Sequence, residues 1–215
     1  MRGFPVILSA PSGAGKTSIR KQLLQRRPDV GYSTSCTTRP PRAGEVEGRD
    51  YHFLSVKQFE ADRDRGDFAE WAVVHGFLYG TKRSEVERFL SVGKHVLMDI
   101  DVQGARQFAR AYPDSVLVFI LPPSGEELMN RLSARGSENK ERLLTRLQNA
   151  LTEMKDVDRY HYVVVNDDLE LAVDRVSSII DAEAVRHDRV HEVERQVEAL
   201  IQQLECEIKI FSRGN

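Results

Sequence analysis

The chain has 215 residues, of which 40% are hydrophobic and 30% charged, the balance of a globular protein with a buried core. The net charge of −2 gives no overall attraction to nucleic acid or an acidic membrane, so anion binding is expected only at local sites. No apolar run approaches the ~18 residues of a membrane span, there is no secretory signal, and two distant cysteines indicate no disulfide framework, so we expect a cytoplasmic protein.

The first predicted elements are a short buried strand (residues 6–8), a glycine-rich turn and a helix (residues 18–27). Glycines let successive N–H groups point inward, and the helix N-terminus adds partial positive charge, so this order forms a phosphate cradle. Lys16 is expected to reach the β- and γ-phosphates of ATP and the Thr17 hydroxyl to ligate Mg²⁺. The predicted ATP-binding loop is Ala10, Pro11, Ser12, Gly13, Ala14, Gly15, Lys16 and Thr17, with Ala10 where the strict motif has glycine.

Further apolar runs occupy residues 96–100, 116–121 and 162–165, with helical patterns between them. Buried runs that alternate with helices predict an α/β fold, with a parallel sheet covered by helices on both faces. Ligands of such sheets bind beyond the carboxyl ends of the strands. Asp99, Asp101 and Asn166 lie at these ends and are therefore candidate site residues.

Between about residues 32 and 82, prolines, glycines and short polar or aromatic pieces replace the buried runs. We predict a small mixed β insertion, of the kind that often carries the substrate in α/β enzymes. It contains one helix, from a capping box at Ser55 to about Arg65, with Gly66 as its stop.

Three more helices are predicted after the insertion. One runs from Ser84 to Gly93, one from a capping box at Ser124 to about Arg135, and one over about residues 138–157. The last two form a hairpin dense in arginine: Arg131, Arg135, Arg142 and Arg146. The hairpin is either an ordinary solvated surface or a lid that closes arginines onto phosphates.

After Leu169 the pattern is helical to near the end of the chain. Apolar residues at heptad spacing make about two heptads, which is too few to decide between packing on the chain's own core and self-association. We therefore expect a monomer or a homodimer. The heptad residues are Val190, Val193, Val197, Leu200 and Leu204, with Ile201 and Ile208 broadening the stripe.

Ordered motifs along the chain resemble those of guanylate kinases over about residues 4–185. With the phosphate loop, they are Ser35-Cys-Thr-Thr-Arg39-Pro-Pro-Arg42, Asp50-Tyr51-x-Phe53, Phe68-x-Glu70-Trp71, Leu78-Tyr79-Gly80-Thr81, Asp99-Ile-Asp101-x-Gln103-Gly104 and Val165-Asn-Asp-Asp168. The resemblance implies MgATP-dependent phosphorylation of GMP to GDP in purine metabolism. It also implies a phosphate-loop core (1–33, 83–123 and 149–185), a GMP-binding subdomain (34–82) and a helical lid (124–148), together a domain over 1–185, with 186–215 as a helical extension.

The resemblance assigns roles to single residues. Two guanidinium forks three residues apart can clamp one phosphate, and phenols can donate to it; the phosphate residues are Arg39, Arg42, Tyr51 and Tyr79. A carboxylate accepts hydrogen bonds from both N1–H and N2–H₂ of guanine, whereas adenine presents an acceptor at N1. The residues assigned to guanine are Ser35, Glu70, Thr81 and Asp101. Asn166 matches a position near the adenine of ATP.

Catalysis needs no general base, because the nucleophile is the phosphate of GMP, whose second pKa is about 6. The assigned catalytic residues neutralise repulsion between two polyanions: Lys16, Arg39, Arg135 and Arg146. Asp99 is expected to orient waters of Mg²⁺. Two alternatives stay open, a guanylate-kinase-like module that binds protein without catalysis, and a kinase for another phosphorylated metabolite.

Overall fold

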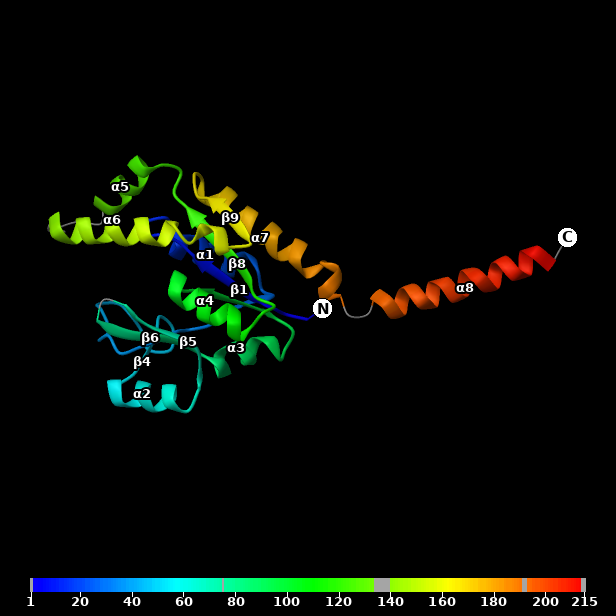
Figure 1. Cartoon of the computed structure of the whole chain (residues 1–215), viewed down its shortest axis with the longest axis horizontal. Coiled ribbons are helices and arrows are strands. Elements are labelled where there is room, and N and C mark those ends of the chain that lie inside the picture. Colours follow the sequence, from blue (N-terminus) through cyan, green and yellow to red (C-terminus); the bar gives the residue numbers. More distant parts are fainter. Residues whose placement is uncertain (1, 75, 134–139, 191–192, 214–215) are drawn as a thin grey trace.

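The computed structural model describes residues 2–74, 76–133, 140–190 and 193–213. Five parallel strands form the central sheet in the order β2-β7-β1-β8-β9. They are β1 (Pro5–Ser9), β2 (Val30–Tyr32), β7 (His95–Asp99), β8 (Val116–Leu121) and β9 (Tyr162–Val165). Four helices cover the sheet (Figure 1): α1 (Lys16–Arg26), α3 (Arg83–Leu90), α4 (Val102–Ala111) and α7 (Leu169–Ala184). The predicted α/β fold with a parallel sheet is confirmed.

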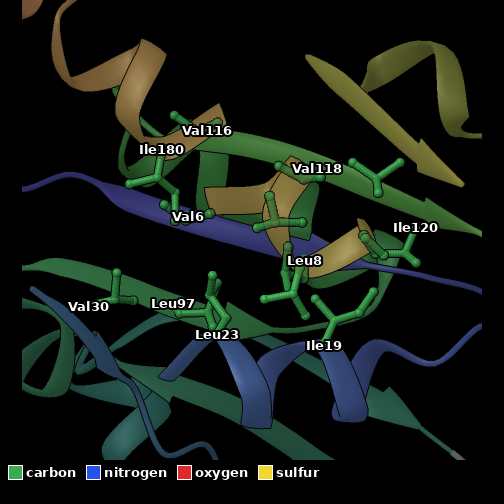
Figure 2. Close-up of a cluster of buried hydrophobic side chains, with 14 of the residues drawn as sticks. Val6, Leu8, Ile19, Leu23, Val30, Leu97, Val116, Val118, Ile120 and Ile180 are labelled. Carbon is green, nitrogen blue, oxygen red and sulfur yellow. The ribbon is translucent and has the colours of Figure 1, made fainter. Parts of the chain in front are cut away.

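The central strand β1 is buried on both faces because its side chains alternate between two apolar clusters. Val6 and Leu8 pack with α1 and α7, and Figure 2 shows them among Ile19, Leu23 and Ile180. Ile7 faces the other way, toward α3 and α4. Each fully buried side chain of this kind stabilises the fold by about 1.5–3 kcal/mol, so the end of β1 is a rigid base for the loop that follows it.

A second, mixed sheet forms the predicted insertion, in the order β4-β3-β6-β5. Its strands are β3 (Cys36–Thr37), β4 (His52–Phe53), β5 (Phe68–Val74) and β6 (Phe77–Lys82). The helix α2 (Val56–Asp64) begins as predicted, with the Ser55 hydroxyl accepting from the Gln58 N–H at 3.2 Å. Phe59 of α2 stacks on Phe68 of β5 over the buried Cys36, which gives this sheet an apolar cluster of its own.

The predicted helical hairpin is α5 (Gly125–Ser133) and α6 (Lys140–Met154). Ser124 caps α5 by accepting from the Glu127 N–H at 3.0 Å. Leu128 and Leu132 of α5 pack against Ala150 of α6. The predicted connection between the helices lies outside the described residues, as does Arg135, and so does the side chain of Arg142 on α6.

One strand was missed, and two predicted helix boundaries were wrong. Strand β2 was not expected, because three residues with Gly31 at the centre make no apolar run. Helix α3 begins at Arg83, directly after β6, so Ser84 lies inside the helix and does not cap it. The predicted helix to residue 157 ends at Met154 and is followed by a 3₁₀ turn, η1 (Val157–Arg159).

The long C-terminal helix is also interrupted, by a second 3₁₀ turn, η2 (His187–Arg189). Arg189 turns back onto α7, where its Nε donates to Glu183 at 3.1 Å and its guanidinium lies 4.3 Å from the Phe4 ring centroid. These contacts with residues of α7 and with Phe4 stabilise a turn at a place where the sequence pattern predicts a continuous helix. The last helix, α8 (Val193–Arg213), begins after it.

Helix α8 extends away from the rest of the molecule in Figure 1. All its residues from Arg195 to Ser212 are exposed. Of the two alternatives for its apolar stripe, packing on the chain's own core is not what this structure shows over residues 195–212. Within the described ranges, no helix has both the length and the apolar character to cross a membrane.

Candidate active site

The phosphate loop connects β1 to α1, as predicted. Gly13 and Gly15 have φ values of 91° and 95°, in the left-handed region that favours glycine. A Cβ on Gly15 would lie 2.2 Å from Nδ2 of Asn166, whose amide donates to the Ala14 carbonyl at 2.7 Å. Asn166, which follows β9, therefore holds the backbone of the loop. The sequence did not predict this contact.

Lys16 and Thr17 occupy the first turn of α1, at the open side of the loop. The Lys16 ammonium donates to the Ile100 carbonyl at 3.3 Å, and the Ser9 hydroxyl donates to the same oxygen at 2.9 Å. Thr17 is exposed. The lysine thus lies between the loop and the end of β7. To bind a phosphate, its ammonium would give up the hydrogen bond to the Ile100 carbonyl.

The helical hairpin lies against the same loop. Arg146 of α6 donates to the Ser12 hydroxyl at 3.1 Å. Leu128 and Leu132 of α5 lie 3.2 and 3.1 Å from the position of a Cβ on Gly13. Arg131 is directed elsewhere, to Glu127 at 2.7 Å and the Asn166 carbonyl at 3.2 Å. Among the described lid arginines, Arg146 is the one in contact with the phosphate loop.

A cavity of about 220 Å³ separates the central sheet from the second sheet. Its lining contains five of the residues predicted for GMP, together with Asp99: Ser35, Tyr51, Glu70, Tyr79 and Asp101. Residues from β5, from β6 and from the end of β7 thus meet at one site, although up to 66 positions separate them in the sequence.

Glu70 is the buried acid of this cavity, with 5% of its surface exposed. Its Oε1 accepts from the Thr81 hydroxyl at 2.6 Å. Burial raises the pKa of Glu70 to about 7, the nearby charge of Asp101 adds to the rise, and the Thr81 hydrogen bond opposes it. A Cβ on Gly104 would lie 2.6 Å from Oε2, so glycine is needed there for the carboxylate to approach α4. Asp101 caps the same helix, accepting from the Gly104 N–H at 2.7 Å.

Arg39 lies at the mouth of the cavity with 8% of its surface exposed. Its guanidinium donates to both Glu45 oxygens, at 2.8 and 2.9 Å, and to the Tyr79 hydroxyl at 3.1 Å. It lies 5.5 Å from the centroid of the Tyr51 ring. Arg42 is exposed, and its backbone N–H donates to Glu45 at 2.8 Å. The structure therefore brings Arg39 together with both predicted tyrosines, and Glu45 holds the guanidinium in place.

Asp99 forms a network with two residues that the sequence did not single out. The Tyr32 hydroxyl donates to Asp99 Oδ1 at 2.6 Å, and Arg20 of α1 lies 3.3 Å from Oδ2. Arg20 also contacts the Tyr32 hydroxyl and lies over the Tyr32 ring. Tyr32 of β2 and Arg20 of α1 thus each hold one carboxylate oxygen of Asp99.

A family model for guanylate kinase matches residues 2–183. The chain belongs to the guanylate kinase family. Curated guanylate kinases from Aromatoleum aromaticum and Thermotoga maritima are each 46% identical to it, covering 89% and 88% of this chain and 94% and 91% of their own lengths. The crystal structure of guanylate kinase from Anaplasma phagocytophilum is also similar, with 34% identity, a TM-score of 0.73 and coverage of 87% of this chain and 89% of that one.

The residues that could hold Mg²⁺ lie at the start of α1. No group of three or more His, Cys, Asp or Glu side chains in the described part of the chain could hold a metal by itself. Mg²⁺ keeps several waters and is usually bound through one or two protein groups plus substrate phosphates. The exposed Thr17 hydroxyl, one residue after Lys16, suits an ion that arrives with ATP.

Glu153 of α6 is a further residue near the phosphate loop that the sequence did not single out. Its Oε2 is buried and has no hydrogen-bond partner among the described residues. Burial raises the pKa of Glu153, while the charge of Lys16 and the Ser12 backbone act to lower it. It therefore lies close enough to the phosphate loop to sense the charge of Lys16. No motif marks a lone glutamate within a charged helix.

Proposed function

We propose that this member of the guanylate kinase family transfers the γ-phosphoryl group of ATP to GMP, and also to dGMP, giving ADP and GDP or dGDP. The observation that carries this proposal is the acidic cavity around Glu70 on one side of β7 and the phosphate loop on the other. Two nucleotides bound at these places can meet with their phosphates above Asp99. We place the reaction in the cytoplasm, with ATP and GMP as partners and no membrane or nucleic acid partner.

In the proposed reaction, an oxygen of the GMP phosphate attacks the γ-phosphorus of ATP in line. A new O–P bond forms, the bond from the γ-phosphorus to the bridging oxygen breaks, and ADP leaves with that electron pair. No side chain has to remove a proton, because the second pKa of a phosphate monoester is about 6. The task of this chain is therefore to position the two nucleotides and compensate their charge.

Charge compensation is assigned to cations around the meeting point. Like unit charges ~4 Å apart repel by about 4 kcal/mol at an effective dielectric constant near 20. Lys16 and Arg146 lie at the phosphate loop, and Arg39 lies at the mouth of the cavity. Arg135 is assigned to the lid, and Arg42, which is exposed, to the GMP phosphate. Mg²⁺ bound with ATP and held by Thr17 would add charge between the β- and γ-phosphates.

Base selection is assigned to Glu70, Asp101, Ser35 and Thr81. The Glu70 carboxylate can accept two guanine donors, and the Thr81 hydroxyl, which donates to its Oε1 at 2.6 Å, supports its orientation. Adenine presents a lone pair where guanine has N1–H, so it would leave the buried acid unpaired. Asn166 is assigned to ATP binding near the adenine, and the hydrogen bond from its amide to the Ala14 carbonyl of the phosphate loop supports this assignment.

The proposed function is tested by a coupled assay of ADP release with GMP, dGMP, AMP and UMP. We expect turnover with GMP and dGMP, and at least about 100-fold lower kcat/KM with AMP. Turnover with none of the four, despite binding of GMP in calorimetry, would indicate a binding module. A preference for AMP or UMP would indicate another kinase.

We expect the Arg20–Tyr32–Asp99 network to position Asp99 for the reaction. Tyr32→Phe removes the donor to a carboxylate and should lower kcat about tenfold. Arg20→Leu should lower it further, and Arg20→Lys should restore part of the loss. The measurements are kcat and the Mg²⁺ concentration for half-maximal activity, which should rise in Tyr32→Phe.

Arg26→Ala is the matched control for this network. Arg26 belongs to the same helix but pairs with Glu170 and Asp174 of α7, on the surface. Its loss should leave kcat and the Mg²⁺ dependence unchanged within about twofold. Equal effects of Arg26→Ala and Arg20→Leu would show that the network only stabilises the helix.

A further inference from the structure

Helix α8 carries an apolar surface that the kinase does not use. Every residue of the helix lies beyond the family match, which ends at residue 183. Six apolar side chains form one stripe along the helix, each between 46% and 77% exposed. We call them the α8 stripe: Val197, Leu200, Ile201, Leu204, Ile208 and Phe211. A contiguous exposed apolar surface of this kind marks an interaction site.

The helix needs a partner for its own stability. A helix of 21 residues is about 31 Å long, and in proteins most of the stability of a helix comes from packing of its apolar face. In Figure 1 α8 points away from both sheets, and its residues from Arg195 to Ser212 are exposed. The covering surface therefore comes from another molecule.

We propose that the α8 stripe pairs with the α8 stripe of a second copy of this chain. Heptad spacing places Val197, Leu204 and Phe211 at one set of seam positions and Leu200 at the other. Six side chains of this kind cover roughly 600 Å² on each helix, so a pair buries about 1,200 Å², at the lower end of stable interfaces. A single surface used by both copies closes into a twofold dimer.

The distribution of charge permits two copies to approach each other. Charged residues lie outside the stripe: Arg195 and Lys209 on the far face, and Glu198 and Glu205 beside the edge that Ile201 and Ile208 form. Uncharged Gln196 and Gln203 border one edge of the stripe, so no row of like charges opposes self-pairing there.

Glu207 decides the direction of the pair. It occupies a seam position one heptad after Leu200. In a parallel pair in register, the two Glu207 carboxylates would face each other and repel. In an antiparallel pair centred on residue 202, Leu200 faces Leu204 of the second copy, and Glu207 lies beside Val197. The proposed pair is therefore antiparallel.

Sedimentation of the full chain at micromolar concentration tests the pairing. The wild type should be a dimer, and Leu204→Asp should raise the dissociation constant at least about 100-fold, because it places a charge in an apolar seam. Gln202→Asp is the matched control, since it introduces the same residue on the opposite face, and it should remain a dimer. A monomeric wild type, a dimeric Leu204→Asp or a monomeric Gln202→Asp would overturn the proposal.

The direction is tested by pulsed electron resonance on a spin label at Ser212→Cys in a Cys206→Ser background, where the remaining Cys36 is buried. Antiparallel pairing places the two labels about 30 Å or more apart. Labels side by side would overturn the antiparallel arrangement. Turnover of ATP and GMP per subunit should be the same in Leu204→Asp and the wild type, so the outcome does not depend on the kinase assignment.

Discussion

Lys16→Ala should abolish phosphoryl transfer while GMP binding stays nearly intact. The ammonium lies at the phosphate loop and is assigned to the charge that develops on the transferred group, where loss of one such donor lowers turnover about 10²- to 10³-fold. Among the described residues, the ammonium donates one hydrogen bond, to the Ile100 carbonyl, so the free energy of unfolding should fall by no more than about 1 kcal/mol. The measurements are kcat by ADP release, the GMP dissociation constant by calorimetry without ATP, and denaturant unfolding.

Lys21→Ala is the control for this variant. Lys21 is an exposed lysine on the same helix, one turn beyond the loop, and it faces no predicted phosphate. It should retain turnover within about twofold. If Lys16→Ala kept more than about a tenth of wild-type kcat, or lost GMP binding with it, the assignment of Lys16 to the ATP phosphates would be wrong.

The binding of GMP should depend on pH through Glu70. The carboxylate must be ionised to accept N1–H and N2–H₂ of guanine, and burial raises its pKa to about 7 in the free protein. As the pH falls below about 7, the GMP dissociation constant should therefore rise, approaching tenfold per pH unit. Calorimetry in two buffers of different ionisation enthalpy should show that GMP binding near pH 6.5 releases a proton.

Glu70→Gln should weaken GMP binding at least about 100-fold, because an amide cannot accept both donors. Its remaining pH dependence should follow only the phosphate of GMP. Glu60→Gln, at an exposed position of α2, is the control and should keep the wild-type profile. Wild-type GMP binding that does not change between pH 6 and pH 8 would contradict the assignment of Glu70.

The same carboxyl should make the free protein less stable as the pH rises. The pKa of Glu70 is about 7 in the folded protein against an ordinary 4.5, so between these values the folded state keeps a proton that the unfolded state releases. The free energy of unfolding should fall from pH 4.5 to pH 7 by about 3 kcal/mol through this group alone. Glu70→Gln should lack this pH dependence, so the difference in the free energy of unfolding between the wild type and the variant should itself change with pH by that amount.

The sequence alone determined those parts of the fold that depend on neighbours along the chain. The phosphate loop needs two glycines, a lysine and a strand and helix on either side, all within residues 5–26. The caps at Ser55 and Ser124 each involve an N–H three residues away. Buried strands appeared as apolar runs, except β2, which was too short to produce one. Local hydrogen bonds and side-chain periodicity act over a few residues, so a pattern is enough to predict them.

Tertiary structure alone decided the contacts between residues far apart. Asn166 reaches Ala14 across 152 positions, and Tyr32 reaches Asp99 across 67. No local pattern predicts such pairs, because the sheet order, and not the sequence spacing, sets which strand ends are adjacent. The turn at Arg189 was missed for the same reason. The apolar stripe on α8 was predicted but its packing was left open, because helical periodicity shows that a face is apolar and only the tertiary structure shows whether the chain itself covers it.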